Sequence, residues 1–540
     1  MFSYSKPAEQ SDNAWKDKMK ILYILFFLLL ISAYIQAQNN FEIDNNSLTH
    51  KNSWLSLQLS KSEINRYSDL IVNPNGTTLL DTINTALTDT MKYNMYGDLL
   101  NDNSAYNPVQ PLWRPIVGVI ASNVLTSMLD IYILNYDWAH VGFVSWGRNL
   151  KAGFPWGQSW IWAPDRFGVN MLLHPYGGAE FFNSARANGY NFWESTPMTF
   201  LGAYMWKIFG ETGTPERNSL IATTFGGIFV GEILYRLSSN VLDDQATGSE
   251  RIFREIAGGL IDPVRFTARL LQGKLLHVTD KEENQKEPLN ITVAAGAHWI
   301  NENSSFGTGG MTELFNINFD YGNPFEKISR KPYDYFKVRG DLNFGVGRKV
   351  VDAVDGFGIL TGTNLQYGNL EMLSGLYQYW DYMDNRAFEL GTFGFGGGLI
   401  TKLKLNESDN LYTNIHLVFD PFGGNSRVGG PDTSQFRDYE FGGGAHTMLE
   451  STLNLGGWIN FSITGYYYWF HTYSGTPGNN YIALFNPSIS VQLYKNLSVG
   501  IQQVSYYSDR YSKYYPSDHV VRTEQKLFVQ LYIENFKFIK

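Results

Sequence analysis

The chain has 540 residues, enough for more than one folded unit. It is 44% hydrophobic and 16% aromatic but only 17% charged, whereas ordinary soluble domains contain about 25% charged residues. This composition argues against a cytosolic enzyme and suits transmembrane strands, in which only alternate residues need be apolar, and the formal charge of −9 argues against nucleic-acid binding.

The first segment of the chain has the pattern of a secretory signal peptide. Lys18 and Lys20 form a basic region, Ile21 to Ile31 is apolar, and small residues follow up to Ala37. We therefore expect residues 1–37 to be a cleaved signal peptide, with an uncleaved membrane anchor as the alternative. Their removal takes away four Lys and three Asp or Glu, so the mature charge becomes −10.

The absence of cysteine limits the chemistry that the chain can perform and how it can be anchored. It excludes disulfides, thiolate metal sites and a cysteine nucleophile. It also excludes anchoring through a lipidated N-terminal cysteine, so the mature protein must hold a membrane through its own fold.

The mature chain begins with a polar region, residues 38–110, that we interpret as a linker or extension. Residues 111–276 then have the pattern of a helical domain. We expect helices over Ile116 to Leu134, from Thr196 and Pro197 to Gly210, and over Leu220 to Tyr235. Two more are expected after Thr247, which has capping-box spacing to Glu250, and from Asp262 and Pro263 to about Gln272. A charged stretch, 275–288, marks the end of this domain.

From residue 290 the hydrophobic period changes to two, which predicts strands. Apolar residues alternate with polar ones in segments that include Asn290 to Trp299, Phe315 to Asp320, Tyr335 to Phe344, Ile459 to Tyr467, Phe485 to Leu493 and Leu527 to Ile533. About twelve such strands can be counted. The pattern predicts that Ile291, Val293, Phe315, Ile317, Ile459, Phe461, Leu527 and Val529 face outward and that Asn316, Asn318, Asn460 and Ser462 face inward.

A soluble antiparallel sandwich would also alternate in this way, and three features favour an outer-membrane barrel over residues 288–540. Short turns at 406–410, 456–457 and 495–496 alternate with longer predicted loops at about 420–446, 471–482 and 508–520. Aromatic clusters at 466–470 and 506–515 suit interfacial girdles. The chain also ends on a Phe-rich alternating strand, as barrel-assembly signals do. The expected fold is a membrane β-barrel of about twelve antiparallel strands preceded by an α-helical unit, α+β overall.

The densest polar motif lies in the predicted helical domain. It includes Asp165, Asn170, His174-Pro175-Tyr176 and Arg186, with Asn170 and His174 four residues apart and Pro175 expected to disturb their helix. This run resembles domain-of-unknown-function family 3943, a family of bacterial envelope proteins, over roughly residues 110–275. The resemblance implies an envelope protein with a β-rich remainder and implies no activity.

Two interpretations of these polar residues remain open. In the first, they form a structural network in an apolar surrounding, in which unpaired charges would be costly; its members would be Asp165, Asn170, His174, Arg186, Glu232, Arg236, Arg254 and Glu255. In the second, His174 is the base of a hydrolase-like site oriented by Glu180, Asp165 or Glu232. No nucleophile elbow or paired metal-ligand spacing accompanies it, so we predict no metal and no cofactor. The structural interpretation is favoured.

The sequence thus predicts an outer-membrane barrel in a Gram-negative-type bacterium, with its helical unit in the periplasm or in the lumen. The expected role is structural, transport-related or envelope-assembly-related, with outer-membrane lipid and the barrel-assembly machinery as partners. The alternative function is an outer-membrane enzyme acting on lipid or envelope polymer through His174. An inner-membrane protein spanning with residues 116–134 and 220–235 is disfavoured by the strands that follow.

Overall fold

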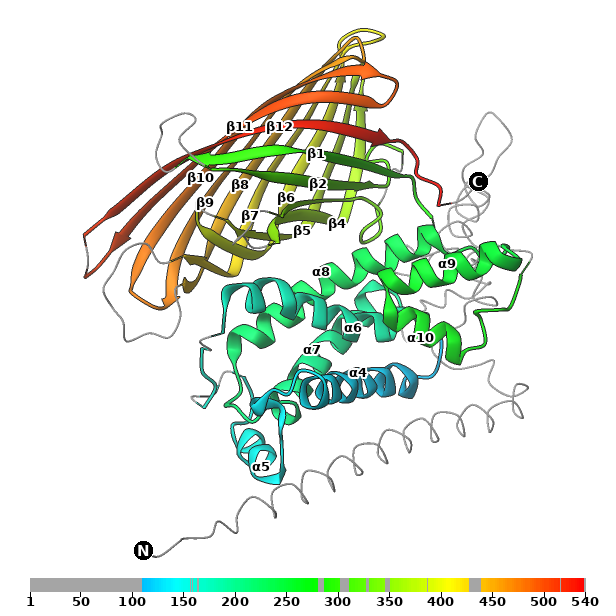
Figure 1. Ribbon diagram of the computed structural model, residues 1–540, viewed down its shortest axis with the longest axis vertical. Helices are drawn as coiled ribbons and strands as arrows, with labels where there is room; N and C mark the ends of the chain where they lie inside the picture. Colours follow the sequence, from blue (N-terminus) through cyan, green and yellow to red (C-terminus); the bar gives the residue numbers. More distant parts are fainter. Residues whose placement is uncertain are drawn as a thin grey trace, which may run out of the picture. The chain divides into compact units, whose positions relative to one another are not determined.

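The computed structural model describes residues 109–540, apart from 156, 158, 163–164, 280–285, 302–309, 327–329, 345–349, 386, 427–438, 515 and 539–540. The predicted signal peptide and nearly all of the predicted linker therefore lie outside the described residues. The chain divides into two compact units, Met1–Val117 and Gly118–Lys540. The second unit contains most of the described helices and all of the described strands (Figure 1).

The helices follow one another through the segment that the sequence assigns to them. They are α4 (Trp113–Tyr132), η1 (Asp137–Ala139), α5 (Phe143–Lys151), the π-helix η2 (Val169–Leu173), α6 (His174–Arg186), α7 (Phe192–Phe209), α8 (Arg217–Val241), α9 (Gly248–Ile261) and α10 (Pro263–Leu271). By length and composition alone, α4 and α8 are apolar enough to cross a membrane, although most of α8 is buried.

Pro175 disturbs its helix as predicted, because the π-helical turn η2 comes directly before it and separates Asn170 from His174 in α6. Helix starts differ from the sequence predictions in two places. The N-cap of α7 is Asn191, whose side chain accepts from Glu194 N, and Pro197 lies inside that helix. Thr247 precedes α9 without a side-chain cap, whereas Asp262 caps α10 as predicted.

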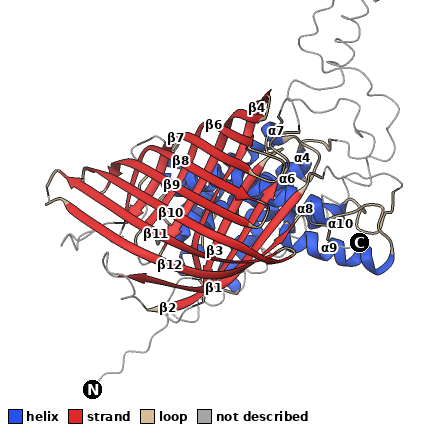
Figure 2. Ribbon diagram, turned by 90° about the horizontal axis from the view of Figure 1, so that it is seen from above, coloured by secondary structure: helices blue, strands red, loops and turns tan. Residues whose placement is uncertain are grey.

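Twelve antiparallel strands close into one barrel in which each strand pairs with its sequence neighbours and β1 pairs with β12 (Figure 2). The strands are β1 (Leu289–Asn301), β2 (Met311–Tyr321), β3 (Phe336–Asn343), β4 (Val351–Tyr367), β5 (Leu370–Asp384), β6 (Glu389–Lys404), β7 (Asn410–Ser426), β8 (Tyr439–Leu455), β9 (Ile459–Ser474), β10 (Gly478–Tyr494), β11 (Leu497–Ser512) and β12 (Asp518–Ile533). The predicted fold class is confirmed.

The alternation of side chains also follows the prediction. Asn316, Asn318, Asn460 and Ser462 line a cavity inside the barrel, and their apolar neighbours point the other way. Phe461, Leu527 and Val529 are exposed on the outer face. Ile291 also faces outward but is only 8% exposed, because a cluster that includes helix residues covers it.

The predicted long loops are shorter than expected, since 471–474, 478–482, 508–512 and 518–520 lie in strands. Of the loop predicted at about 420–446, 427–438 lie outside the described residues, and the rest is strand. In the aromatic run at 466–470, Tyr466, Tyr468 and Phe470 point into the lumen, whereas Tyr467 and Trp469 are exposed on the outer face, so the girdle stays a prediction. Glycine- and aspartate-rich segments suggested loops, but Gly444 lies in β8, where a Cβ would be 1.7 Å from the Trp469 carbonyl oxygen.

Helix α8 crosses the outer wall of the barrel from β6 to β1. Phe225 contacts Phe395 of β6, Phe229 contacts Trp380 of β5, and Asn240 donates to the Glu287 carbonyl just before β1. Phe395 and Trp380 belong to two neighbouring rows of outward-facing residues, because Phe395 pairs with Gln378 whereas Trp380 pairs with Phe393. The helix rises roughly 22 Å from Phe225 to Asn240, which matches about 24 Å for five strand spacings.

The contacts of α8 and η2 with β5 lie on the outer side of the barrel wall. Trp380 and Gln378 are outward residues of β5, whereas their neighbours Tyr379 and Asp381 face the lumen. Gln378 donates to the Phe225 carbonyl of α8, and Trp380 Nε1 donates to the Met171 carbonyl of η2. At these contacts α8 and η2 therefore cover part of the outer wall and do not enter the lumen.

Candidate functional site

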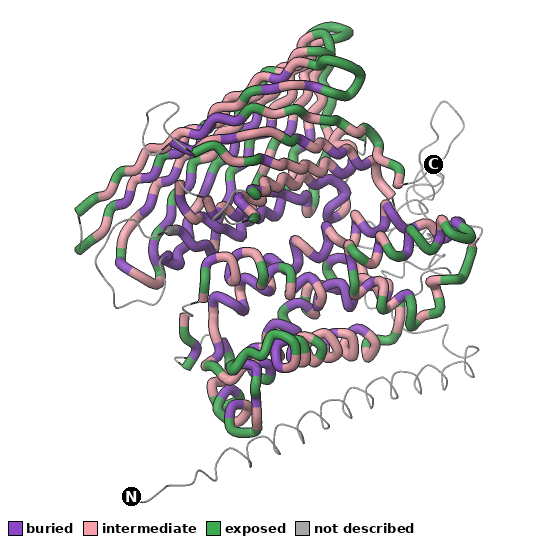
Figure 3. The backbone as a smooth tube through the Cα atoms, in the orientation of Figure 1, coloured by how far each residue is buried: buried purple, intermediate pink, exposed green. Residues whose placement is uncertain are grey.

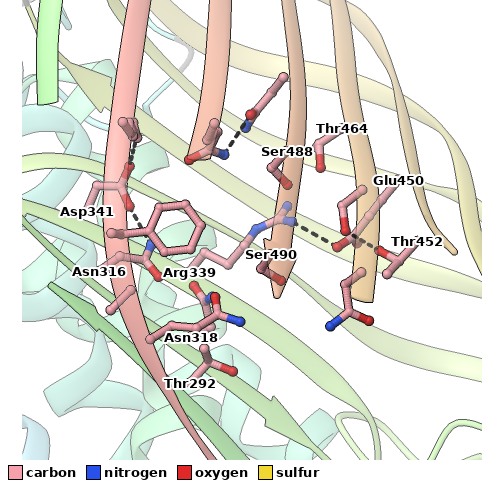
Figure 4. A pocket seen from close by; sticks show the side chains of 18 of the residues that line it. Thr292, Asn316, Asn318, Arg339, Asp341, Glu450, Thr452, Thr464, Ser488 and Ser490 are labelled. Carbon is pink, nitrogen blue, oxygen red and sulfur yellow. Dashed lines mark hydrogen bonds and ion pairs between the residues drawn. The ribbon is translucent and has the colours of Figure 1, made fainter. Parts of the chain in front are cut away.

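Polar side chains line a cavity inside the barrel. This cavity of about 460 Å³ lies in the half nearest the short turns and is lined mainly by amide, hydroxyl and charged groups (Figure 4). Its uncharged polar lining includes Asn316, Asn318, Asn460, Ser488, Ser490 and Gln530. The Oδ1 atom of Asn318 has no hydrogen-bond partner among the described residues.

The charged groups around this cavity are paired with one another. Lys337 Nζ lies 2.8 Å from Glu450 Oε1, and Arg339 donates to Asp355 Oδ2 at 2.6 Å. Lys526 Nζ lies 2.7 Å from Asp341 Oδ2. Because each cation already has a carboxylate partner, the cavity offers no free cation to attract an anionic solute.

Beyond the cavity, toward the longer connections, aromatic and aliphatic side chains fill the lumen. One cluster joins β6 to β9, β10 and β11, and its members are Phe388, Leu390, Tyr468, Phe470, Ile482, Leu484, Val504 and Tyr506. Buried polar pairs accompany it: His298 with Glu524, and His446 Nδ1 with Asp420 at 2.8 Å. The lumen is thus a polar chamber with a closed far end.

His174, the centre of the predicted hydrolase-like site, lies at the start of α6 near the start of α8. Its Nε2 is 3.0 Å from Ser219 Oγ and 3.9 Å from Asp165 Oδ2. Ser219 donates to Glu216 Oε2 at 2.8 Å and is fully buried. A catalytic serine would have to reach a substrate, and this hydroxyl is instead enclosed between His174 and a carboxylate.

Charges around His174 bind one another. Burial raises the pKa of Asp165, but the hydrogen bond to His174 and the charges of His174 and Lys207 together hold that pKa below its ordinary value. Lys207 lies 2.7 Å from Glu211 and 3.0 Å from Glu216. In the described part of the chain, no group of three or more His, Cys, Asp or Glu side chains is arranged to hold a metal ion.

Asn170 links this cluster to the barrel. Asn218 Nδ2 donates to Asn170 Oδ1, and Asn170 Nδ2 donates to the Tyr439 hydroxyl, both at 2.6 Å. Tyr439 in turn donates to the Asp165 carbonyl at 2.7 Å. Sequence reasoning missed Ser219, Asn218 and Tyr439, since a serine, an asparagine and a tyrosine carry no motif of their own.

The other residues of the predicted network form two further clusters. Arg186 donates twice to Glu232, at 2.7 and 3.0 Å, and Arg236 donates to Glu232 at 2.8 Å. Arg254 pairs with Glu250, whereas Glu255 binds Arg269. Among the described residues, Arg186 therefore belongs to the Glu232 cluster and not to the His174 cluster.

Glu180, a weaker catalytic candidate, lies on α6 away from His174. Burial raises the pKa of Glu180 to about 7, and the neighbouring Asp262 carboxylate adds to the rise. Burial also raises the pKa of Asp262 to about 6, although the hydrogen bond that its carboxylate accepts from Arg265 N lowers that pKa. The two carboxyl groups belong to the contact between α6 and α10.

These features define the class of protein: a closed antiparallel barrel of twelve strands with a helical unit on its outer wall. Residues 159–264 match a family described as "Domain of unknown function (DUF3943)", so the resemblance inferred from the His174 region is confirmed for that segment. No curated protein matches the chain.

Solved structures that the chain resembles include outer membrane channels. The channel DcaP of Acinetobacter baumannii has 8% identity and a TM-score of 0.23, over 45% of this chain and 96% of the other. An outer membrane channel from Pseudomonas putida F1 has 8% identity and a TM-score of 0.26, over 47% and 100%. The Pseudomonas putida toluene transporter TodX has 8% identity and a TM-score of 0.21, over 46% and 89%.

Proposed function

We propose that this protein is an outer-membrane β-barrel whose lumen admits small, neutral, hydrophilic solutes. The proposed membrane position is supported by the contrast between the two faces of the wall. Leu417 and Phe419 on β7 are exposed outward at 67% and 61%, whereas His416 and Asp420 on the same strand are buried in the lumen. A band of exposed apolar side chains around a closed barrel suits hydrocarbon and not water.

We infer the class of solute from one observation. The 460 Å³ chamber is lined by amides and hydroxyls, and its charged side chains are paired with one another. Chambers of this size accept small molecules. Hydroxyl-rich solutes exchange hydrogen bonds with Asn, Ser and Gln side chains, whereas a charged solute would have to break an existing ion pair.

Passage through the barrel requires the far end of the lumen to open. Phe470 on β9 and Leu484 on the neighbouring strand β10 both belong to this lumen cluster, so we treat the cluster as the gate. Truncating a gate residue should widen the path without touching the polar chamber.

The test is liposome swelling with the full-length protein and isosmotic sucrose, sodium glutamate or lysine hydrochloride. Phe470→Ala is expected to raise the sucrose rate several-fold over wild type and to favour sucrose over both charged solutes. Tyr467→Ala is the matched control, because Tyr467 lies on the same strand but is exposed on the outer face. A Phe470→Ala barrel that admits no more sucrose than protein-free liposomes would refute the proposal.

A further inference from the structure

Helices α9 and α10 have an inverted distribution of apolar and charged side chains. On α9, Phe253 is 64% exposed and Leu260 is 80% exposed. On the opposite face of the same helix, Arg251 and Glu255 are 2% and 5% exposed. Figure 3 shows exposed stretches recurring along these helices while α8 is largely buried. A helix in water does the reverse, with its charges outside and its apolar residues inside.

The buried charges are joined in one network between the two helices. Arg269 of α10 lies 2.7 Å from Glu255 and 2.6 Å from Asp244, and Arg251 lies 3.2 Å from both carboxylates. Charges that pair inside a helical packing while apolar side chains face outward are typical of proteins surrounded by hydrocarbon.

Helix α9 lies near the end of the barrel. It follows α8, whose C-terminal end lies beside the start of β1, and Asn240 there donates to the Glu287 carbonyl. Arg254 on the buried side of α9 lies 5.9 Å from the ring of Phe538, just beyond β12. Helix α9 is therefore close to the end of the barrel at which the short turns lie.

We propose that this face, which we call the α9–α10 lipid face, lies in the acyl chains of the leaflet next to the short turns. It consists of Ile252, Phe253, Ile256, Leu260, Leu270 and Leu276. The partner is a phospholipid bilayer surface, recognised through apolar area and not through charge, because the arginines of this region are turned inward. The proposal rests on the proposed membrane position of the barrel.

Single-cysteine labelling can test this surface cleanly, because the native chain has no cysteine. Spin labels would be placed at Leu260→Cys, at Leu417→Cys on the outer wall, and at Ser408→Cys in the exposed turn between β6 and β7. The full-length variants would be reconstituted in phosphatidylethanolamine–phosphatidylglycerol vesicles. Collision of each label with oxygen, which concentrates in lipid, would be compared with collision with a water-soluble nickel complex.

The expected result is that Leu260→Cys resembles Leu417→Cys, with oxygen collisions several-fold above those at Ser408→Cys and few nickel collisions. If the Leu260 label resembles that at Ser408, the face lies in water and the inference is overturned. If it is shielded from both reagents, protein covers the face and the inference is again overturned. A water-exposed label at Leu417 would instead refute the membrane position of the barrel itself.

Discussion

At the scale of single residues, buried carboxylates organise the helical unit. Glu232 is fully buried and binds two arginines, Arg186 and Arg236. The spacing of Glu232 and Arg236 indicates such a pair in the sequence, but the third member comes from another helix. Removing one charge from a buried group of this kind leaves its partners without compensation.

Replacing Glu232 by Gln keeps the shape of the side chain and removes its charge. We expect Glu232→Gln to lower the free energy of unfolding by about 3–5 kcal/mol, the usual loss when one partner of a buried ion pair is removed. Urea unfolding followed by helical circular dichroism measures it. Glu371→Gln is the control, because Glu371 pairs with the exposed Lys404 and should change stability by about 1 kcal/mol or less. Equal effects of the two changes would contradict the structural role of Glu232.

At the scale of elements, close helix contacts depend on glycine. A Cβ on Gly178 of α6 would lie 1.9 Å from the Thr223 carbonyl oxygen of α8. The two helices can therefore pack this closely only because residue 178 is a glycine. Another face of α6 brings Glu180 toward Asp262, which caps α10. The packing therefore places two carboxyl groups close together in a buried position.

This contact should make stability depend on pH. The pKa of Glu180 is about 7 in the folded chain against an ordinary value of 4.5, so the folded state holds a proton that the unfolded state has released. The resulting stabilisation is fully present below about pH 4.5 and is lost as the pH rises through about 7. In the wild type, the urea midpoint of the helical signal should therefore fall between about pH 5 and pH 8. Glu180→Gln should make this fall smaller. An unchanged slope in the variant would assign the pH dependence to other groups.

At the scale of the whole second unit, the strands could be predicted from the sequence, but the position of the helices could not. A period of two over Asn290 to Trp299 fixes which residues share a face, because successive side chains of a strand alternate. An apolar helix such as α8 has the same pattern whether it faces lipid, lumen or a barrel wall. Its partners are also remote: Gln378 and Phe225 are 153 positions apart.

The candidate sites show the same limit. The sequence pointed to His174 and Asp165, which the structure places 3.9 Å apart. It could not pair Lys337 with Glu450, because these residues lie on β3 and β8, across the lumen from one another. The alternating pattern of their strands indicates that both side chains face inward. Only the closed barrel shows which inward-facing charged residues pair with one another.

The last prediction tests whether the helical unit is held by the barrel wall. Phe229 is fully buried between Trp380 and Tyr333, with ring centroids at 5.9 and 5.8 Å. Phe229→Ala should therefore lower the free energy of unfolding of the helices by about 3–5 kcal/mol, through lost burial and the cavity left behind. Urea unfolding followed by helical circular dichroism measures this loss. Heat-modified gel mobility should stay at its wild-type value, because the hydrogen-bonded barrel does not depend on this ring.

Phe200→Ala on α7 is the matched control, since Phe200 is 37% exposed and stacks only on Tyr204 among its described ring contacts. Its cost should be about 0.5 kcal/mol. If both variants unfold alike, the aromatic contact with the wall contributes little, and the helical unit folds independently of the barrel. A large loss confined to Phe229→Ala would instead mean that the contact of Phe229 with Trp380 and Tyr333 on the barrel side stabilises the helical unit.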